Sequence, residues 1–258
     1  MAGRGVSIII AVWNQLRYTK LSVDSVLKSS RGTVFELIIV DNGSRPDVDA
    51  YFDSLRASGV DIQYIRNEEN LGPIRAMNQG IARAKYDYIA VMHNDVIILQ
   101  EGWLEKILSH MEGDPRIGIV GLAGRQEIYD TGCVNEVSLK HDLRNEDLNP
   151  PMKEEAAEVA VIDGLCFVMV RRFLEKIKGF DETFGYMHCY DLDISLQSIK
   201  AGFKNVVVKV AAMHIGNGGM TRQLGEYKEL VKDDYGLLNT NCRIFSEKWR
   251  GMLPLKIS

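Results

Sequence analysis

The sequence predicts an α/β protein with a mostly parallel central sheet flanked by helices. Two continuous apolar, β-branched runs, Val6–Val12 and 34–40, are typical of strands buried on both faces. The segment between them repeats apolar residues at helical spacing up to Lys28, so the three segments predict a βαβ unit. The chain has no Gly-x-Gly-x-x-Gly after the first strand and no P-loop motif, which argues against a dinucleotide site and a kinase-like phosphate loop.

Strands and helices continue to alternate along the chain. We expect helices over 46–58, from Gly72 onward, around Trp103 and from Asp191 toward Gly202, and strands over 62–65, 88–92, 117–122, 159–170 and 205–210. The spacing around Trp103 indicates core packing rather than a platform for a sugar. Residues 124–151 lose periodicity and predict an irregular insertion, and residues after 221 predict a helical tail.

Composition limits the kinds of partner. The 258 residues suffice for one large domain or a domain with a tail, and a net charge of −4 argues against a nucleic-acid partner. The four cysteines form no metal or disulfide pattern and indicate a cytoplasmic protein with reduced thiols. No signal peptide or bilayer-spanning run is present, so any membrane association is expected to be peripheral, through the basic and aromatic tail at the inner face.

Three polar residues, His93, Asn94 and Asp95, interrupt an apolar run between Tyr88 and Leu99. In a strand, His93 and Asp95 point to one face while Asn94 points to the other. At the carboxyl end of a strand in an open α/β sheet, that face meets the ligand crevice. A carboxylate suits Mg²⁺ or Mn²⁺ and an imidazole favours Mn²⁺ or softer metals, whereas the alternative is a polar turn capped by Asp95.

A second constellation places Asp191 and Asp193 in the first turn of a predicted helix. The helix dipole favours carboxylates there, and capping accounts for one of them better than for the pair. His214 precedes a glycine-rich loop over 216–219 that could close over phosphates, although a lone histidine is more often structural. Asp163 and Gly164 interrupt a strand, as a turn or bulge would.

Two earlier turns are further candidates for a ligand site. Asp41 and Gly43 follow the second strand in a sequence that also suits an ordinary tight turn. Gly72 precedes Pro73 at the start of a helix whose first turn holds Arg75. A cation at that end opposes the helix dipole, which favours an anion-binding role over a solvated surface arginine.

These segments together resemble the inverting family-two glycosyltransferases with the A-type (GT-A) fold, in the right order from about residue 6 to residue 219. Residues 93–95 resemble the family's Asp-x-Asp motif, which holds a divalent cation under a sugar nucleotide's diphosphate, with His93 in place of the first aspartate. Residues 190–193 resemble its Glu-Asp-x-Asp motif, with Tyr190 in place of the glutamate. The segment 37–44 resembles the strand whose aspartate, here Asp41, meets the nucleotide base.

The resemblance implies a role for each matching residue. Asp191 is implied as the catalytic base, and Asp95 with His93 and His214 as ligands of Mn²⁺ or Mg²⁺. Donor binding is implied for Val12, Trp13, Asn14, Asp41, Gly43, Asn70, Gly72, Arg75, Asn78 and Asn94, and the acceptor side for Asp163, Gly164, Tyr190 and Asp193. One GT-A-like domain over 1–220 then has a nucleotide-sugar half (about 1–100) and an acceptor half (about 101–220), followed by the tail, 221–258.

The implied activity is inverting transfer from a nucleotide-diphosphate sugar, a UDP- or dTDP-sugar, to a hydroxyl of a glycan or lipid-linked acceptor. Such a reaction would serve bacterial-type polysaccharide or glycoconjugate synthesis. One alternative is a nucleotidyltransferase, which would need a glycine-rich basic loop where Trp13-Asn14-Gln15-Leu16 stands. The other is a non-catalytic sugar-nucleotide-binding protein, suggested by the departures at His93 and Tyr190.

Overall fold

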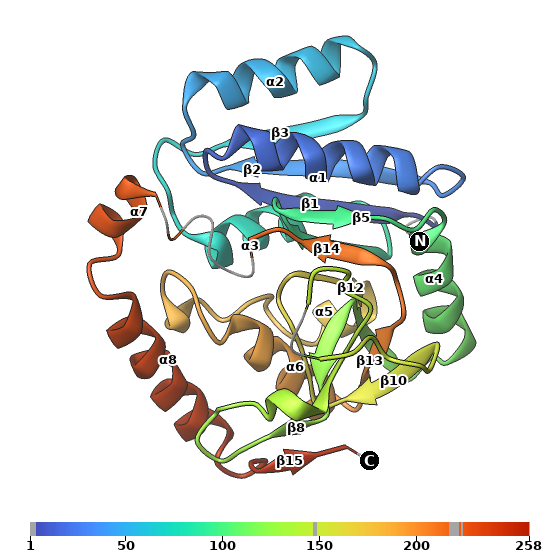
Figure 1. Cartoon of the computed structure of the whole chain (residues 1–258), viewed down its shortest axis with the longest axis vertical. Coiled ribbons are helices and arrows are strands. Elements are labelled where there is room, and N and C mark those ends of the chain that lie inside the picture. The colour runs from blue at the N-terminus through green and yellow to red at the C-terminus, as the bar shows by residue number, and fades with distance from the viewer. Residues whose placement is uncertain (1–3, 147–148, 217–221, 223, 258) are drawn as a thin grey trace.

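The computed structural model describes residues 4–146, 149–216, 222 and 224–257. Its centre is an eight-stranded sheet in the order β10-β13-β6-β12-β4-β1-β2-β3 (Figure 1). The strands are β1 (Val6–Val12), β2 (Phe35–Asp41), β3 (Ile62–Arg66), β4 (Tyr88–His93), β6 (Ile117–Gly121), β10 (Ala156–Val159), β12 (Cys166–Val170) and β13 (Lys204–Val208). All but β10 and β12 run in one direction, which confirms the predicted mostly parallel sheet.

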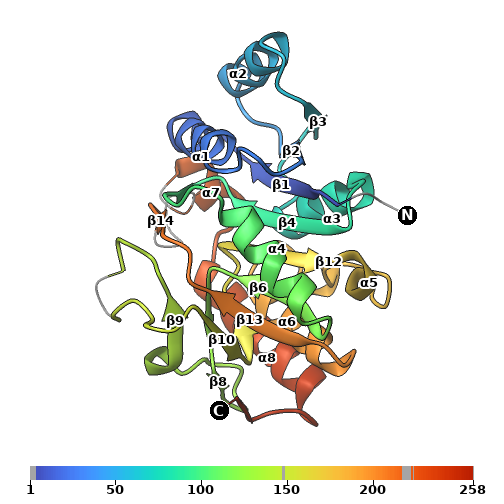
Figure 2. The same ribbon diagram turned by 90° about the vertical axis from the view of Figure 1, so that its right-hand side faces the viewer.

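Helices cover both faces of this sheet. They are α1 (Leu16–Ser29), α2 (Pro46–Ala57), α3 (Pro73–Arg83), α4 (Trp103–Gly113), α5 (Arg171–Leu174), α6 (Tyr190–Lys200), α7 (Gly225–Leu230) and α8 (Asp234–Trp249), with 3-10 turns at Glu136–Ser138 and Glu182–Phe184. Helices α1 and α3 lie on opposite sides of β1 (Figure 2), as right-handed crossovers running in opposite directions require. Trp103 is fully buried and donates to Ser30 Oγ at 2.9 Å, which confirms its core position.

The strand order reverses between β1 and β4. From β1 the chain moves outward to β2 and β3, and then α3 returns it to β4 on the other side of β1. The connections that leave the carboxyl ends of β1 and β4 therefore run in opposite directions along the sheet. Open α/β sheets bind their ligands at this kind of reversal, so the fold itself marks where a site is expected.

The expectation of an irregular insertion over 124–151 is wrong. This region contains β7 (Ala123–Arg125), β8 (Glu127–Ile128) and β9 (Leu139–His141), and β7 pairs with both β9 and β11 (Val161–Ile162). Each of these strands has only two or three residues, too few to show an alternating pattern. Pairing of β7 with β11, which is distant in sequence, supplies backbone hydrogen bonds that so short a strand needs.

The C-terminal residues fold back onto the domain as helices, as predicted. Trp249 of α8 is buried and its Nε1 donates to Asp193 Oδ1 at 2.8 Å, so its indole ring is not free to meet a membrane. The chain then returns as β15 (Leu255–Lys256), which pairs with β8. Among the described residues, no helix combines the length and apolar character that a bilayer crossing needs.

Gly80 of α3 offers a test of how tightly the helix packs on β1. A Cβ at this position would lie 2.4 Å from Cγ2 of Ile9, well inside contact distance. Gly80→Ala should lower the free energy of unfolding by about 1–2 kcal/mol, because overpacking outweighs the gain in helix propensity. Urea denaturation measures this change.

Gly113→Ala on α4 is the matched control, since a Cβ there meets nothing within 4 Å. It should leave stability unchanged or raise it by up to about 1 kcal/mol. Equal effects of the two substitutions would contradict the close packing of α3.

Candidate active site

Three potential metal ligands meet where β4 ends. Asp95 lies in the turn between β4 and β5 (Val96–Ile98), and β5 pairs antiparallel with β14 (Ala212–His214). This pairing places His214 Nε2 3.3 Å from Asp95 Oδ1, and the ring centroids of His214 and His93 5.5 Å apart. One ligand atom from each of the three residues lies within 4.8 Å of the others.

The chemistry of this cluster fits a divalent cation. Nitrogen and oxygen ligands lie about 2.0–2.2 Å from such ions, so opposite ligands are about 4–4.4 Å apart. Nε2 of His214 is buried and, within the described chain, has Asp95 Oδ1 at 3.3 Å but no hydrogen bond of good geometry, so both atoms can ligate one ion. Burial is the main cause that lowers the pKa of His93, to about 4, so this imidazole is neutral at pH 7.

The carboxylate of Asp95 is also in the form that binds metals. Burial acts to raise its pKa, but the contact with His214 and the nearby His93 outweigh burial and lower it. Asp95 is therefore ionised at neutral pH, between two imidazoles that can donate electron pairs. Two nitrogens and one carboxylate oxygen suit Mn²⁺ or a softer ion better than Mg²⁺.

A cavity of about 810 Å³, counting the open space at its mouth, lies at the reversal point beside the cluster. Six residues predicted from the sequence line it: Val12, Trp13, Asn70, His93, Asn94 and Asp95. Nine other residues complete the wall: Ala11, Asn42, Pro73, Met77, Met92, Tyr186, Met187, Arg222 and Tyr227. The strand ends therefore supply one side of the cavity, and later segments of the chain supply the other.

Sequence reasoning missed the contribution of the C-terminal region to this wall. Tyr227 donates its hydroxyl to Asp234 Oδ1 at 2.6 Å, and His188 Nε2 lies 2.9 Å from the same oxygen. Arg222 Nε lies 3.4 Å from Asp234 Oδ2, which holds the guanidinium near the cavity. The sequence signal for a role of this region in binding is a basic residue, Arg222, soon after His214. The predicted glycine-rich loop from Asn217 lies outside the described residues.

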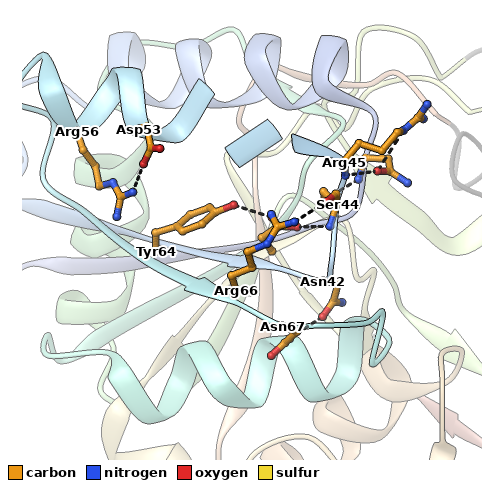
Figure 3. A network of polar contacts seen from close by, with 10 residues as sticks. Asn42, Ser44, Arg45, Asp53, Arg56, Tyr64, Arg66 and Asn67 are labelled. Carbon is orange, nitrogen blue, oxygen red and sulfur yellow. Dashed lines mark hydrogen bonds and ion pairs between the residues drawn. The ribbon is translucent and has the colours of Figure 1, made fainter. Parts of the chain in front are cut away.

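Asp41 does not reach the cavity in this structure. It is fully buried, and its Oδ2 accepts hydrogen bonds from the Tyr64 hydroxyl and from Arg66 Nη1, both at 2.6 Å. Its Oδ1 accepts the Ser44 backbone N–H at 2.8 Å, and Figure 3 shows Tyr64, Arg66 and Ser44 converging on this point. These contacts fix the turn after β2, and the next residue, Asn42, lines the cavity instead.

Asn14 and two glycines predicted to bind the donor lie just behind the wall. Asn14 has a φ of 55° and accepts the Arg45 backbone N–H through Oδ1 at 2.9 Å. Gly43 has a φ of 71°, and Gly72 has a φ of 85°. A Cβ at Gly72 would lie 2.6 Å from the Tyr186 carbonyl oxygen, so only glycine lets Tyr186 approach the wall.

Asn78 and Arg75 of α3 also lie away from the cavity wall. Asn78 accepts the backbone N–H of Phe180 at 2.9 Å and donates to its carbonyl at 3.0 Å, which ties α3 to the loop before α6. Arg75 is 57% exposed and pairs with Glu182 at 3.4 Å. The anion that attracts Arg75 in this structure is therefore a carboxylate of the protein itself.

Asp191 is held at the start of α6 by two backbone donors. Its Oδ2 accepts the N–H of Gly164 at 2.9 Å and its Oδ1 accepts the N–H of Leu192 at 3.0 Å. Burial and then the negative charge of Asp163 raise its pKa to about 6, against the lowering effect of these hydrogen bonds. Asp163 itself pairs with Arg125. A carboxylate with this pKa is ionised at pH 7 and is a stronger base than an ordinary aspartate.

The other residues of the 190–193 segment have different surroundings. Asp193 is buried and accepts hydrogen bonds from Trp249 and from Gln197 Nε2 at 2.6 Å, so it anchors α8. The Tyr190 hydroxyl lies 2.9 Å from Nε2 of His93. A Cβ at Gly164 would lie 2.5 Å from that hydroxyl, so Tyr190 contacts the cluster through His93 and Gly164 packs against Tyr190.

Solved structures share this fold. One is GalNAc-T7 with UDP, GalNAc and Mn²⁺, with a TM-score of 0.67 and 14% identity over 88% of this chain and 48% of that protein. Another is the mannosyltransferase PcManGT of Pyrobaculum calidifontis with GDP-Man and Mn²⁺, with a TM-score of 0.63 and 12% identity over 96% of this chain and 70% of that protein. They confirm the predicted GT-A fold, that of A-type glycosyltransferases.

The sequence comparison identifies the family. The family described as Glycosyl transferase family 2 matches residues 7–177, so the chain belongs to that family. The pre-mycofactocin glycosyltransferase of Mycobacterium tuberculosis is 26% identical over 77% of this chain and 40% of its own length. The hyaluronan synthase of Pasteurella multocida is 25% identical over 98% of this chain and 28% of its own length. The chain thus spans less than half the length of these two relatives.

The raised pKa of Asp191 predicts a pH-dependent stability. Because the folded-state pKa of about 6 exceeds the usual 3.8, the unfolded chain releases this proton first as pH rises. Asp191 therefore costs stability increasingly from about pH 4 to pH 6, and the full cost persists above pH 6. Asp191→Asn removes this dependence, so the parent should lose stability relative to the variant as pH rises from 4 to 7.

Urea unfolding of both proteins at several pH values measures the difference. A difference that stays constant, or that changes in the opposite direction, would show that the carboxyl group is not held in the surroundings described.

Proposed function

We propose that this protein is an inverting glycosyltransferase that moves a sugar from a nucleotide-diphosphate donor to an acceptor hydroxyl. The observation that carries this proposal is the cluster of His93, Asp95 and His214 on and beside the wall of a cavity at the reversal point of the sheet. Membership of glycosyl transferase family 2 supports the reaction class. The neighbouring structures contain UDP or GDP-Man together with Mn²⁺, which supports a metal-dependent nucleotide-sugar donor.

The donor's diphosphate is proposed to lie between the metal cluster and Arg222. Arg222 is the one arginine or lysine that the described part of the chain places on this wall, and it can pair with a phosphate oxygen. Asn42, Asn70 and Asn94 line the same cavity and offer amide donors and acceptors to the nucleotide and the sugar. A bound divalent cation, with Mn²⁺ preferred, supplies positive charge to the departing diphosphate. We propose a UDP- or dTDP-sugar as the donor.

Asp191 is proposed to act as the general base. It takes the proton of the acceptor hydroxyl while that oxygen attacks the anomeric carbon, and this single displacement inverts the configuration. Its pKa of about 6 keeps it ionised at neutral pH with enough basicity for proton transfer. The acceptor is proposed to be a glycan or a lipid-linked sugar that approaches over Asp163 and Gly164.

A transfer assay with Asp191→Asn tests this assignment. The amide keeps the size of the side chain but cannot take a proton, so kcat should fall by roughly 10²–10⁴-fold. Binding of UDP and Mn²⁺, measured by calorimetry, should stay within a few-fold of the parent. In the parent, kcat/KM should rise with pH to a plateau above about pH 6, following the pKa of the base.

Asp114→Asn is the control, because this carboxylate pairs with Arg116 on the surface, and it should transfer sugar normally. Transfer by Asp191→Asn within a few-fold of the parent would remove Asp191 as the base. Donor binding without transfer or hydrolysis by the parent, across a panel of acceptors, would favour a non-catalytic binding protein.

A further inference from the structure

Tyr190 occupies an unusual place at the start of α6. Its ring is buried and packs edge-on against Phe180, with the ring centroids 5.7 Å apart. Its hydroxyl lies 2.9 Å from Nε2 of His93, on a strand nearly one hundred residues earlier. Tyr190 is absent from the cavity wall, so its hydroxyl faces a proposed metal ligand rather than the open space. The two residues that depart from the family's motifs are therefore in contact with each other.

The local backbone holds this hydroxyl in place. His188 and Cys189, immediately before α6, have φ values of 74° and 59°, a conformation that side-chain-bearing residues adopt only where the surroundings enforce it. Gly164 lies against the hydroxyl, since a Cβ there would be 2.5 Å from the oxygen. The tyrosine is therefore constrained both by the turn before it and by the glycine beside it.

A neutral imidazole has one N–H and one lone pair. A histidine that ligates a metal commonly donates its other ring N–H to a neighbouring group, and that hydrogen bond fixes the ring and its tautomer. In the described chain, the Tyr190 hydroxyl is the hydrogen-bond partner of Nε2 of His93. If Nε2 carries the proton, Nδ1 is the ring atom whose lone pair is free for a cation.

We propose that Tyr190 is a positioning residue of the metal centre: its hydroxyl accepts a hydrogen bond from Nε2–H of His93 and thereby presents Nδ1 to the cation. This inference deepens the proposed function and rests on it, because it concerns the same site. It also links both departures from the motifs, since the hydroxyl at 190 is the group that contacts the histidine at 93. Tyr190 then acts through His93 and touches neither donor nor acceptor.

Binding of Mn²⁺ alone tests the proposal without any transfer assay. Electron paramagnetic resonance measures the concentration of the free ion during the titration. Tyr190→Phe keeps the ring and removes the hydroxyl, so the Kd for Mn²⁺ should rise about 10–100-fold. Tyr64→Phe is the matched control: it removes a partly buried tyrosine hydroxyl that bonds Asp41 instead of a member of the cluster, and should change the Kd less than two-fold. Circular dichroism and thermal unfolding confirm that each variant is folded.

A double-mutant cycle shows whether Tyr190 acts through His93. His93→Ala should weaken Mn²⁺ binding, and adding Tyr190→Phe to it should produce no further loss. An unchanged Kd in Tyr190→Phe, or the same fold-loss in the presence and absence of His93, would overturn the proposal. If Tyr190→Phe does not fold, Gly164→Ala replaces it, because the added methyl group displaces the hydroxyl and should also weaken Mn²⁺ binding.

Mn²⁺ binding by the parent protein distinguishes a failure of the Tyr190 role from a failure of the proposed metal-dependent function. A parent protein that binds Mn²⁺ normally and is insensitive to Tyr190→Phe contradicts the role of Tyr190 alone. A parent that binds no Mn²⁺, with or without UDP, overturns the metal centre, and both the role of Tyr190 and the proposed metal-dependent function fall with it.

Discussion

The pairing of β5 with β14 is the interaction on which the site depends. Asp95 and His214 are far apart in sequence, and the antiparallel ladder sets His214 opposite Val96, with the N–H of Ile215 donating to the carbonyl of Asp95 at 3.0 Å. Backbone hydrogen bonds next to the turn after β4 thus place two proposed metal ligands in contact. The parallel pairing of β1 with β4 places His93 and the cavity beside them. The proposed metal centre is in this sense a product of strand register.

A second set of contacts joins the proposed metal centre to the proposed base. Tyr190 and Asp191 are consecutive; one contacts His93, and the other accepts the N–H of Gly164. Because both side chains meet at Gly164, a displacement of that residue would disturb the two halves of the site together. The buried Asp193, in the same first turn of α6, accepts a hydrogen bond from Trp249 and fixes α8, so this helix start also holds the C-terminal region against the domain.

The sequence predicted the parallel sheet well, because long β-branched runs and amphipathic helices have unmistakable periods. It also predicted that His93 and Asp95 lie together, and the structure brings them into one cluster, although Asp95 lies in the turn after β4 and not in the strand itself. It did not predict the surroundings of Asp41, whose carboxylate is used by Tyr64 and Arg66 in the structure. A turn motif shows only that the residue is near a strand end, not which neighbours reach it first.

The missed residues share a different cause. Arg222 and Tyr227 reach the cavity because α7 and the residue before it return to the strand ends late in the chain, and their sequence shows no period that indicates a binding role. The short strands β7 and β8 were not predicted for a similar reason, because each is stabilised by pairing with a segment distant in sequence. Tertiary contacts, rather than local propensity, decide both cases.

Anomalous diffraction at the manganese edge, from crystals grown with Mn²⁺ and UDP, tests the central claim most directly. A single strong peak is expected about 2.0–2.3 Å from a carboxylate oxygen of Asp95, Nδ1 of His93 and Nε2 of His214, next to the diphosphate. A peak elsewhere, or UDP bound in the cavity at saturating Mn²⁺ with no peak between these three residues, would contradict the central claim.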